Sequence, residues 1–382
     1  MNDSLHNPFR PTFGASPRYW AGRASALNDY DEAIGAGPGH PHRSLVLSGS
    51  RGIGKTVLLS ELEDRARAHG WLILRTPSTP GMAGRLVDSI IPEALHTFRG
   101  RAKRRDITGL RVMGLGSIST DLDAEAEPTP TLTSRMHQLA DALAPHNTGF
   151  VISVDEVQDA DPTDLHELAT AYQDLIRDDK NVSLIVAGLT HGVDTLLDLP
   201  GTTFMRRARR FDLGPLTDDD AQQALLHTAR GSGIEMTEEA ATRAALVAQG
   251  YPYLVQLVGS LAWDVARRAG RASISPDDIL AIEREAIDTI ALQVHHPSMK
   301  GVPDGQRNVL LAMARVMGED NHPVAVADIA AEMGKTTKGL SDSRHKLIAR
   351  DLIAPAGWGE VEFVLPYFKE YLGSGGRTSK LH

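Results

Sequence analysis

The chain has 382 residues, with 41% hydrophobic and 23% charged side chains and a formal net charge of -9 at pH 7. A chain of this length is too long for one ordinary compact core, so two or three domains are expected. The composition is that of a globular protein. The negative charge excludes a protein that coats nucleic acid by bulk attraction, but screening over about 10 Å leaves a local basic patch effective.

Three absences in the sequence narrow the class of protein further. No apolar run reaches the roughly 18 residues that a bilayer requires, so no membrane association is expected. The start of the chain, Met1-Asn2-Asp3-Ser4, lacks the basic and apolar segments of a secretory signal. The sequence contains no cysteine, which excludes disulfides and thiolate metal sites and agrees with a cytoplasmic location.

The first half of the chain alternates between two kinds of pattern. Residues 1–17 indicate a loose lead-in, and residues 19–34 a short helix. Strands are expected at 44–47, 71–74, 150–154, 182–187 and 211–213, and helices at about 57–69, 86–98, 133–143 and 164–177. Residues 99–130 interrupt this order with a basic run, a hairpin pattern at Leu110–Ile118 and an acidic linker. The alternation predicts an α/β fold with a parallel sheet over residues 18–215.

The second half of the chain changes character twice. Beyond Pro215 the strand patterns stop, and helical patterns predict an all-helical lid over residues 216–293. Residues 302–372 show helices at about 306–317, 327–333 and 338–350, followed by strand patterns at 352–353 and 361–365. Two helices joined by a Gly-containing turn and followed by two strands predict a winged-helix domain. Residues 373–382 are expected to form a flexible tail.

A glycine-rich motif lies between the first strand and the following helix. The sequence from Gly49 to Thr56 fits G-x-x-x-x-G-K-[ST] at every fixed position, and it has the strand and helix that this P-loop motif requires. Its backbone N–H groups would hold phosphate oxygens, Lys55 would neutralise phosphate charge and Thr56 would ligate Mg²⁺. We therefore expect ATP or ADP to contact Gly49, Ser50, Arg51, Gly52, Ile53, Gly54, Lys55, Thr56 and Val57.

An acidic pair ends the buried strand pattern at 150–154. Such sheets bind ligands at the carboxyl ends of their strands, where Asp155 would hold Mg²⁺. Glu156 is placed to orient and polarise the attacking water as general base. Acidic pairs also end strands for structural reasons, but the motif upstream makes the functional interpretation the stronger one. The pair favours hydrolysis over mere nucleotide binding.

With these motifs in place, residues 18–372 resemble the AAA+ side of the P-loop ATPases (ASCE class). The group joining origin-recognition-type initiators, archaeal-type ATPases and STAND signalling ATPases is the nearest in pattern. The resemblance is carried by Trp20-Ala21-Gly22-Arg23, Asp155-Glu156, Leu184-Ile185-Val186-Ala187-Gly188-Leu189-Thr190 and Gly250-Tyr251-Pro252. It implies that Gly22 and Arg23 help to form the pocket for the nucleotide base, and that Pro252 contacts the nucleotide from the lid.

The resemblance also implies catalytic residues outside the two motifs. Thr190, or His191 beside it, falls at the "sensor 1" position near the γ-phosphate, although a polar residue capping a strand is an equal alternative. Arg206 or Arg207 falls where relatives carry an arginine finger, which acts on a neighbour's nucleotide and implies a nucleotide-dependent homo-oligomer. One departure is present, because Gly250-Tyr251-Pro252-Tyr253 lacks the "sensor 2" arginine of initiators. This favours the STAND-like or archaeal-type branch.

The last predicted helix carries the basic residues that bear on partners. In this helix and the turn before it, Lys335, Lys338, Arg344, Lys346 and Arg350 outnumber the single acid Asp342, which fits contacts to the backbone of duplex DNA. The alternative is a winged helix that contacts protein and keeps a solvated basic face. A second basic run, Arg99–Arg105, is more typical of a solvated loop.

Three functions are consistent with the sequence. The first is a Mg²⁺-dependent ATPase that couples its nucleotide state to DNA association, as in an initiator or a mobile-element protein. The second is a STAND-like signalling or defence switch whose winged helix contacts only protein. The third is a transcription regulator that uses the nucleotide as a structural ligand.

Overall fold

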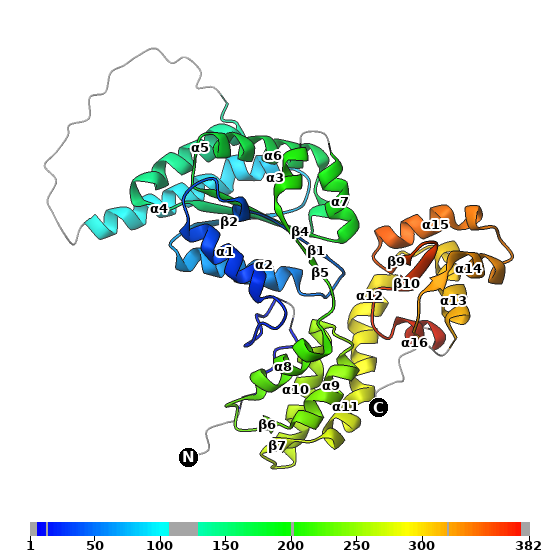
Figure 1. Ribbon diagram of the computed structural model, residues 1–382. Coiled ribbons are helices and arrows are strands. Elements are labelled where there is room, and N and C mark those ends of the chain that lie inside the picture. The colour runs from blue at the N-terminus through cyan, green and yellow to red at the C-terminus, as the bar shows by residue number, and fades with distance from the viewer. Residues whose placement is uncertain (1–5, 13, 107–128, 200–201, 319–320, 376–382) are drawn as a thin grey trace, which may run out of the picture.

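A computed structural model of the chain describes residues 6–12, 14–106, 129–199, 202–318 and 321–375. The hairpin expected at Leu110–Ile118 and most of the expected tail, residues 376–382, lie outside the described residues. The described part contains a parallel sheet, a helical region beside it and a smaller C-terminal region (Figure 1).

The sheet confirms the predicted α/β fold. Its strands are all parallel and lie in the order β2-β3-β4-β1-β5. They are β1 (Ser44–Gly49), β2 (Leu72–Pro77), β3 (Phe150–Asp155), β4 (Val182–Gly188) and β5 (Arg209–Leu213). The central strands read as continuous apolar runs because both faces of the sheet are covered. The carboxyl ends of β1, β3 and β4 therefore meet along one edge.

Helices cover the two faces of the sheet as separate layers. Leu45 and Leu47 of β1 pack in the same apolar cluster as Leu58 and Leu62 of α2. Val46, between them, packs in a second cluster with α4, α5, α6 and α7 on the other face, because successive strand residues point to opposite sides. The helices are α1 (Ala24–Gly35), α2 (Lys55–Ala68), α3 (Met82–Arg85), α4 (Ile91–Asp106), α5 (Leu132–Leu143), α6 (Pro162–Arg177) and α7 (Thr190–Asp198).

Three segments of this core differ from the sequence-based expectation. The first helix begins at Ala24 rather than residue 19, because residues up to Arg23 line the site described below. Helix α4 continues to Asp106 through the whole basic run, which was expected to interrupt it. Helix α7 was not predicted, and its short sequence begins directly after β4.

The helical region follows β5 and packs beneath the sheet, in green and yellow in Figure 1. It contains α8 (Asp218–Ala229), α9 (Glu238–Ala248), α10 (Pro252–Arg268), α11 (Pro276–Ile290) and α12 (His296–Met299). The expectation that strands stop at Pro215 needs a correction. Two short strands, β6 (Glu235–Met236) and β7 (Ser273–Ile274), pair in parallel at the end of this region. They lie directly before α9 and α11, and two residues each are too few to give a strand pattern in the sequence.

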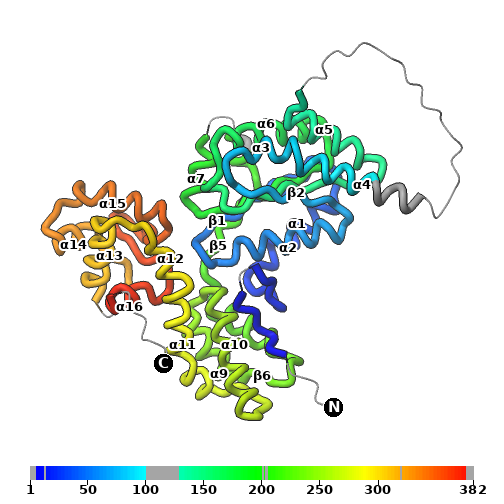
Figure 2. The backbone as a smooth tube through the Cα atoms, turned by 180° about the vertical axis from the view of Figure 1, so that it is seen from behind, coloured from blue at the N-terminus to red at the C-terminus, as the bar shows by residue number. Residues whose placement is uncertain are grey.

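The C-terminal region has its own apolar cluster, built around Leu310, Leu347 and Phe368. A three-stranded sheet of order β8-β10-β9 packs with four helices. The elements are α13 (Asp304–Met317), β8 (Val324–Ala325), α14 (Val326–Glu332), α15 (Thr337–Ala349), β9 (Ile353–Gly357), β10 (Glu360–Phe363) and α16 (Phe368–Gly373). In both views this region lies beside the core on the side of α7 (Figures 1 and 2). Among the described residues, no helix combines the length and apolarity needed to cross a membrane.

Candidate nucleotide-binding site

The P-loop joins the end of β1 to the start of α2 at the carboxyl edge of the sheet. Gly52 and Gly54 have φ values of +73° and +95°, which residues with a Cβ rarely adopt. A Cβ on Gly52 would also lie 1.8 Å from the hydroxyl of Tyr251. Tyr251 precedes α10, and its hydroxyl donates to the carbonyl of Arg51 at 2.7 Å. The loop is therefore held from the helical region, and its N–H groups with the N-terminus of α2 suit an anion.

The Lys55 ammonium lies deep in this loop. Its side chain is only 5% exposed, and Nζ donates to the carbonyl oxygens of Gly49 and Ser50 at 2.9 and 2.8 Å. Burial lowers the pKa of Lys55, and the carboxylates of Glu156, Asp351 and Asp155 oppose that shift. A buried cation with flexible carbonyl partners is suited to exchange those partners for a phosphate.

A short hydrogen bond links the P-loop helix to the acidic strand. Thr56 Oγ1 donates to Asp155 Oδ2 at 2.7 Å, and the main-chain N–H of Glu156 donates to Asp155 Oδ1 at 2.9 Å. Burial raises the pKa of Asp155, while these hydrogen bonds oppose the shift. No group of three or more His, Cys, Asp or Glu side chains that could hold a metal ion occurs in the described parts of the chain. One hydroxyl and one carboxylate fit Mg²⁺, which takes few protein ligands and keeps water and phosphate oxygens.

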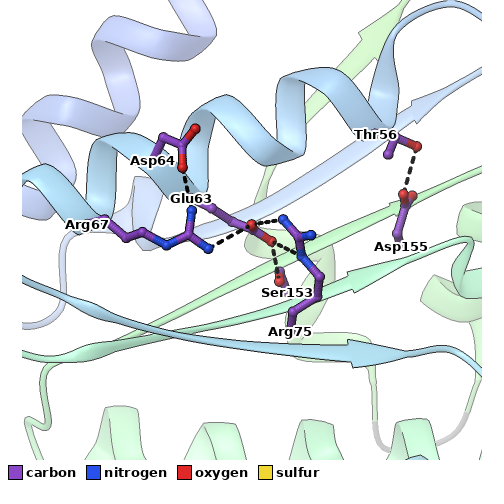
Figure 3. Close-up of polar contacts among 7 residues, drawn as sticks. All are labelled: Thr56, Glu63, Asp64, Arg67, Arg75, Ser153 and Asp155. Atoms are coloured by element: carbon purple, nitrogen blue, oxygen red, sulfur yellow. Dashed lines mark hydrogen bonds and ion pairs between the residues drawn. The ribbon is translucent and has the colours of Figure 1, made fainter. Parts of the chain in front are cut away.

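The helix carrying Lys55 and Thr56 is fastened to the sheet by a buried carboxylate that the sequence analysis missed (Figure 3). Glu63 of α2 is fully buried and accepts hydrogen bonds from Ser153 Oγ at 2.6 Å and Arg75 Nε at 3.1 Å. Arg75 is on β2, and Ser153 is two residues before Asp155 on β3. This network therefore fixes α2 against the strand that supplies the acidic pair.

A cavity of about 350 Å³ opens beside the P-loop. Its walls come from the P-loop and Glu156, from residues 19–23, from the start of α10 and from residues 293–298. Arg23 lines it and donates to the carbonyl of Gly214 at 2.7 Å, and Pro252 lines it as the first residue of α10. The arrangement has room for a base and sugar next to a phosphate-binding loop.

Part of the cavity wall comes from residues 1–17, which were expected to form a loose lead-in. Residues 6–12 and 14–17, here called the N-terminal arm, form no helix or strand but contribute Arg10, Pro11 and Thr12 to the cavity. Phe9 is 4% exposed and lies against Gly259 of α10, where an added Cβ would be 2.3 Å from the ring. Asn7 donates to the carbonyl and hydroxyl oxygens of Ser260 at 3.0 Å.

The predicted sensor and finger residues lie outside this cavity. Thr190 is exposed and begins α7 immediately after Leu189 at the end of β4. Arg206 is held by the carbonyl of Leu197 and the carboxylate of Asp198, at 3.0 and 2.8 Å. Arg207 is exposed. Among the described residues, Thr190, Arg206 and Arg207 are not part of the cavity wall.

The C-terminal region reaches the P-loop through a residue that sequence reasoning did not find. Asp351, with φ +60°, follows α15, and its Oδ2 accepts a hydrogen bond from the main-chain N–H of Arg51 at 2.8 Å. Burial raises the pKa of Asp351, against the opposing effects of the Arg51 N–H and Lys55. A second contact joins His345 of α15 to His191 of α7, with ring centroids 5.5 Å apart. A single acidic residue after a helix gives no sequence signal for a contact 300 residues away.

The basic residues singled out for DNA are all on the surface of this region. Lys335, Lys338, Arg344 and Lys346 are exposed, and Lys346 pairs with Asp342 at 2.8 Å. Trp358 is fully exposed at the turn between β9 and β10. Of the other basic run, Arg99 lies exposed on α4.

Comparison with known proteins agrees with this geometry. Residues 19–186 match the AAA ATPase domain family, and residues 292–372 match a domain of unknown function (DUF8462). No curated protein matches the sequence. A Walker-type ATPase of Pyrococcus abyssi is similar in structure, with a TM-score of 0.61, 15% identity, and 93% of this chain and 96% of that chain covered. The ORC2 protein of Aeropyrum pernix, determined with ADPNP and ADP, gives a TM-score of 0.58 at 13% identity, with 96% of each chain covered.

These structural likenesses show the fold, and the family match identifies its nucleotide-binding part. The P-loop between β1 and α2 and the Thr56–Asp155 contact lie within the matched residues. The chain thus has the P-loop NTPase fold, and its residues 19–186 match the AAA ATPase domain family, which supports ATPase activity.

Proposed function

We propose that this protein is a Mg²⁺-dependent ATPase in which nucleotide binding releases the C-terminal region, a winged-helix domain, for association with duplex DNA. One observation carries the proposal: the carboxylate of Asp351 lies on a main-chain N–H of the P-loop. A carboxylate and a phosphate are both anions, and both seek the N–H groups of this loop. The two would therefore compete for the same loop.

The roles in hydrolysis follow from the positions of the side chains. Lys55 would exchange its two carbonyl partners for phosphate oxygens, and Thr56 with Asp155 would hold Mg²⁺. When bound, the metal would neutralise charge that develops on the phosphates. Glu156 lines the cavity and would orient and deprotonate water as general base.

We further propose that hydrolysis is completed by a second copy of the chain. Thr190, just after β4, would respond to the γ-phosphate. Arg207 is the better candidate for an arginine finger, because Arg206 is already held by Asp198. A finger acting between copies would make hydrolysis depend on a nucleotide-driven homo-oligomer.

Docking and DNA binding use the same face of α15. Lys338 and His345 are seven residues apart, about two helical turns, and so share one face of the helix. His345 contacts His191 of α7 in the docked arrangement. A duplex that entered between α15 and α7 would have to replace that contact. ATP would repel Asp351 from the P-loop and so free this face, which is a ligand-biased equilibrium between two states.

The test measures DNA affinity in three nucleotide states. We expect the full-length protein to bind a duplex of random sequence at least tenfold more tightly with a non-hydrolysable ATP analogue than with ADP or without nucleotide. Binding should weaken steeply as salt rises, because phosphate contacts release counterions. The double variant Lys338→Glu with Arg344→Glu should lose binding but keep the ATPase rate. Asp304→Lys, at the exposed first residue of α13, is the control for an unrelated change of charge.

The outcomes separate this function from its rivals. Equal DNA affinity in all nucleotide states contradicts the coupling. No DNA binding at low salt, combined with ATP-dependent assembly, would favour the STAND-like switch. The contact of α15 with α7 also supports that alternative, because it is a contact of the C-terminal region with protein. A Glu156→Gln variant with intact DNA regulation would favour a regulator that only binds nucleotide.

A further inference from the structure

Gln158 joins two parts of the ATPase site that are distant in sequence. It lies in the short helical turn Val157–Asp159 that follows the acidic pair. Its Nε2 donates to Glu156 Oε2 at 2.5 Å, and its Oε1 accepts from the main-chain N–H of Leu189 at 3.0 Å. Leu189 directly precedes Thr190 and α7. One side chain therefore touches both the carboxylate proposed as the base and the segment proposed as the sensor.

The chemistry of the two contacts fixes which way the amide points. A main-chain N–H can bond only to the oxygen of the Gln158 amide, so the oxygen must face Leu189. The NH₂ group then faces Glu156 and donates to its carboxyl oxygen. This bond occupies Oε2 of Glu156 and leaves Oε1 free of it, in a residue that lines the cavity.

Two glycines form a seat around Gln158. A Cβ on Gly188 would lie 2.7 Å from Cγ1 of Val157 and 2.9 Å from Oε1 of Gln158, and a Cβ on Gly192 would lie 2.3 Å from Cβ of Gln158. Neither glycine has a positive φ, so the backbone does not require glycine at either position. At Gly192 the space is filled by Gln158, and at Gly188 it is filled by Val157 and Gln158 together. The first turn of α7 therefore leaves room for Gln158, and the end of β4 leaves room for the turn that carries it.

We propose that Gln158 is a positioning residue for ATP hydrolysis, which holds Glu156 toward the water and links its orientation to the segment Gly188–Gly192. The inference rests on the proposed function, because it assigns Glu156 the role of base. A shift of Leu189 when Thr190 meets a γ-phosphate would pass through the Gln158 amide to the carboxylate. Partners of this kind, which orient a reacting group, are typically worth about 10- to 100-fold when the group they orient is a metal ligand, and we expect a similar size here.

The experiment combines two variants at Gln158 with a double-mutant cycle. Gln158→Met keeps the length of the side chain and removes both hydrogen bonds. Gln158→Glu keeps an acceptor for Leu189 but places a second carboxylate against Glu156. We expect both to lower kcat by about 10- to 100-fold, while affinity for a fluorescent, non-hydrolysable MgATP analogue and the melting temperature stay within about twofold and 2 °C of the parent. Gly192→Ala should lower kcat in the same way, because its Cβ would displace Gln158.

The cycle distinguishes positioning from a merely structural role. In a Glu156→Gln background, Gln158→Met should have no further effect on the residual rate, because the group that it orients is already gone. Asp159→Asn, in the same turn and exposed, is the matched control and should leave kcat unchanged. An equal loss of rate in both backgrounds, or an unchanged kcat in Gln158→Met, overturns the inference while the ATPase function stands. A parent protein that binds MgATP without hydrolysing it overturns both.

Discussion

Glu63 and Ser153 meet inside the core, where Ser153 Oγ donates to the fully buried carboxylate of Glu63 at 2.6 Å. Arg75 and Arg67 supply the opposing charge from more exposed positions. Because Ser153 and Asp155 point to the same face of β3, this contact and the Thr56–Asp155 contact both fasten α2 to one strand.

Removal of this carboxylate should therefore be costly. We expect Glu63→Ala to lower the free energy of unfolding by about 3 kcal/mol, since it strips buried donors of their acceptor. Asp64→Ala, one residue along and exposed, removes only the surface ion pair with Arg67 and should cost less than about 0.5 kcal/mol. Urea unfolding of the two variants is the measurement, and equal losses would contradict the assigned role.

Lys55 offers the direct test of the nucleotide site. We expect Lys55→Ala to weaken MgATP binding by at least about 100-fold, because the buried ammonium faces the phosphates in a site of low dielectric. Equilibrium binding of a fluorescent ATP analogue measures it. Lys180→Ala, whose ammonium pairs with Asp141 at 2.7 Å on the opposite edge of the sheet, is the control. If Lys55→Ala binds MgATP as the parent does, the site is assigned wrongly.

Two changes at Asp351 separate its charge from its hydrogen bond. Asp351→Asn keeps an oxygen that can accept from Arg51 but removes the negative charge, so MgATP affinity should rise about tenfold while the C-terminal region stays docked. Asp351→Ala removes both, so affinity should rise and docking should be lost.

Docking can be followed by energy transfer between dyes. The sequence contains no cysteine, so Glu167→Cys on α6 and Asn308→Cys on α13, both exposed, provide unique attachment sites. Unchanged energy transfer in the Asp351→Ala variant would show that the contact with Arg51 does not hold the C-terminal region against the P-loop.

The same reporter tests a pH dependence. Burial raises the pKa of Asp351 in the docked state; Arg51 and Lys55 oppose the rise, and Glu156 adds to it. A released Asp351 would have an ordinary pKa, so the docked state binds the proton more tightly. Lowering the pH from about 7.5 toward the raised pKa should therefore increase docking. Energy transfer should rise on acidification in the parent and stay flat in Asp351→Asn; a fall in the parent reverses the assigned sign.

The N-terminal arm should contribute to nucleotide affinity. Gly259→Ala would force Phe9 out of its position, because the new Cβ would overlap the ring. We expect MgATP affinity to fall about fivefold, since Arg10, Pro11 and Thr12 would leave the cavity. Gly305→Ala, where an added Cβ meets nothing, is the control for a helical glycine replaced by alanine. An unchanged affinity would mean that the arm covers the cavity without contacting the nucleotide.

The sequence predicted the parts of the site that depend on local order. The P-loop and the Asp155-Glu156 pair follow buried strands, and the periodicity of those strands and of α2 is strong enough to place them at one edge. The contacts of Glu63, Asp351 and Phe9 were not predictable in this way. Each depends on which segments meet in three dimensions, and a single Glu, Asp or Phe has no spacing that reveals its partner.

The packing of the N-terminal arm and the existence of α7 were also not predictable from the sequence. The arm has the Pro, Asn and Gly content of an irregular segment, and it is irregular, but its packing against α10 comes from Phe9 fitting a glycine. Helix α7 is short, and its buried residues Val193 and Leu196 are too few to form a clear helical period. The roles assigned to Thr190, Arg207 and the basic residues of α15 stay predictions.

The separation of 300 residues between Arg51 and Asp351 also sets an order of events during synthesis. The chain is made from its N-terminus, and domains generally fold as units while the rest is still being translated. The phosphate loop is thus complete long before the ribosome reaches the aspartate that competes for it. A nascent core that binds nucleotide is stabilised by mass action. The C-terminal region would therefore dock on a core whose P-loop can already hold nucleotide.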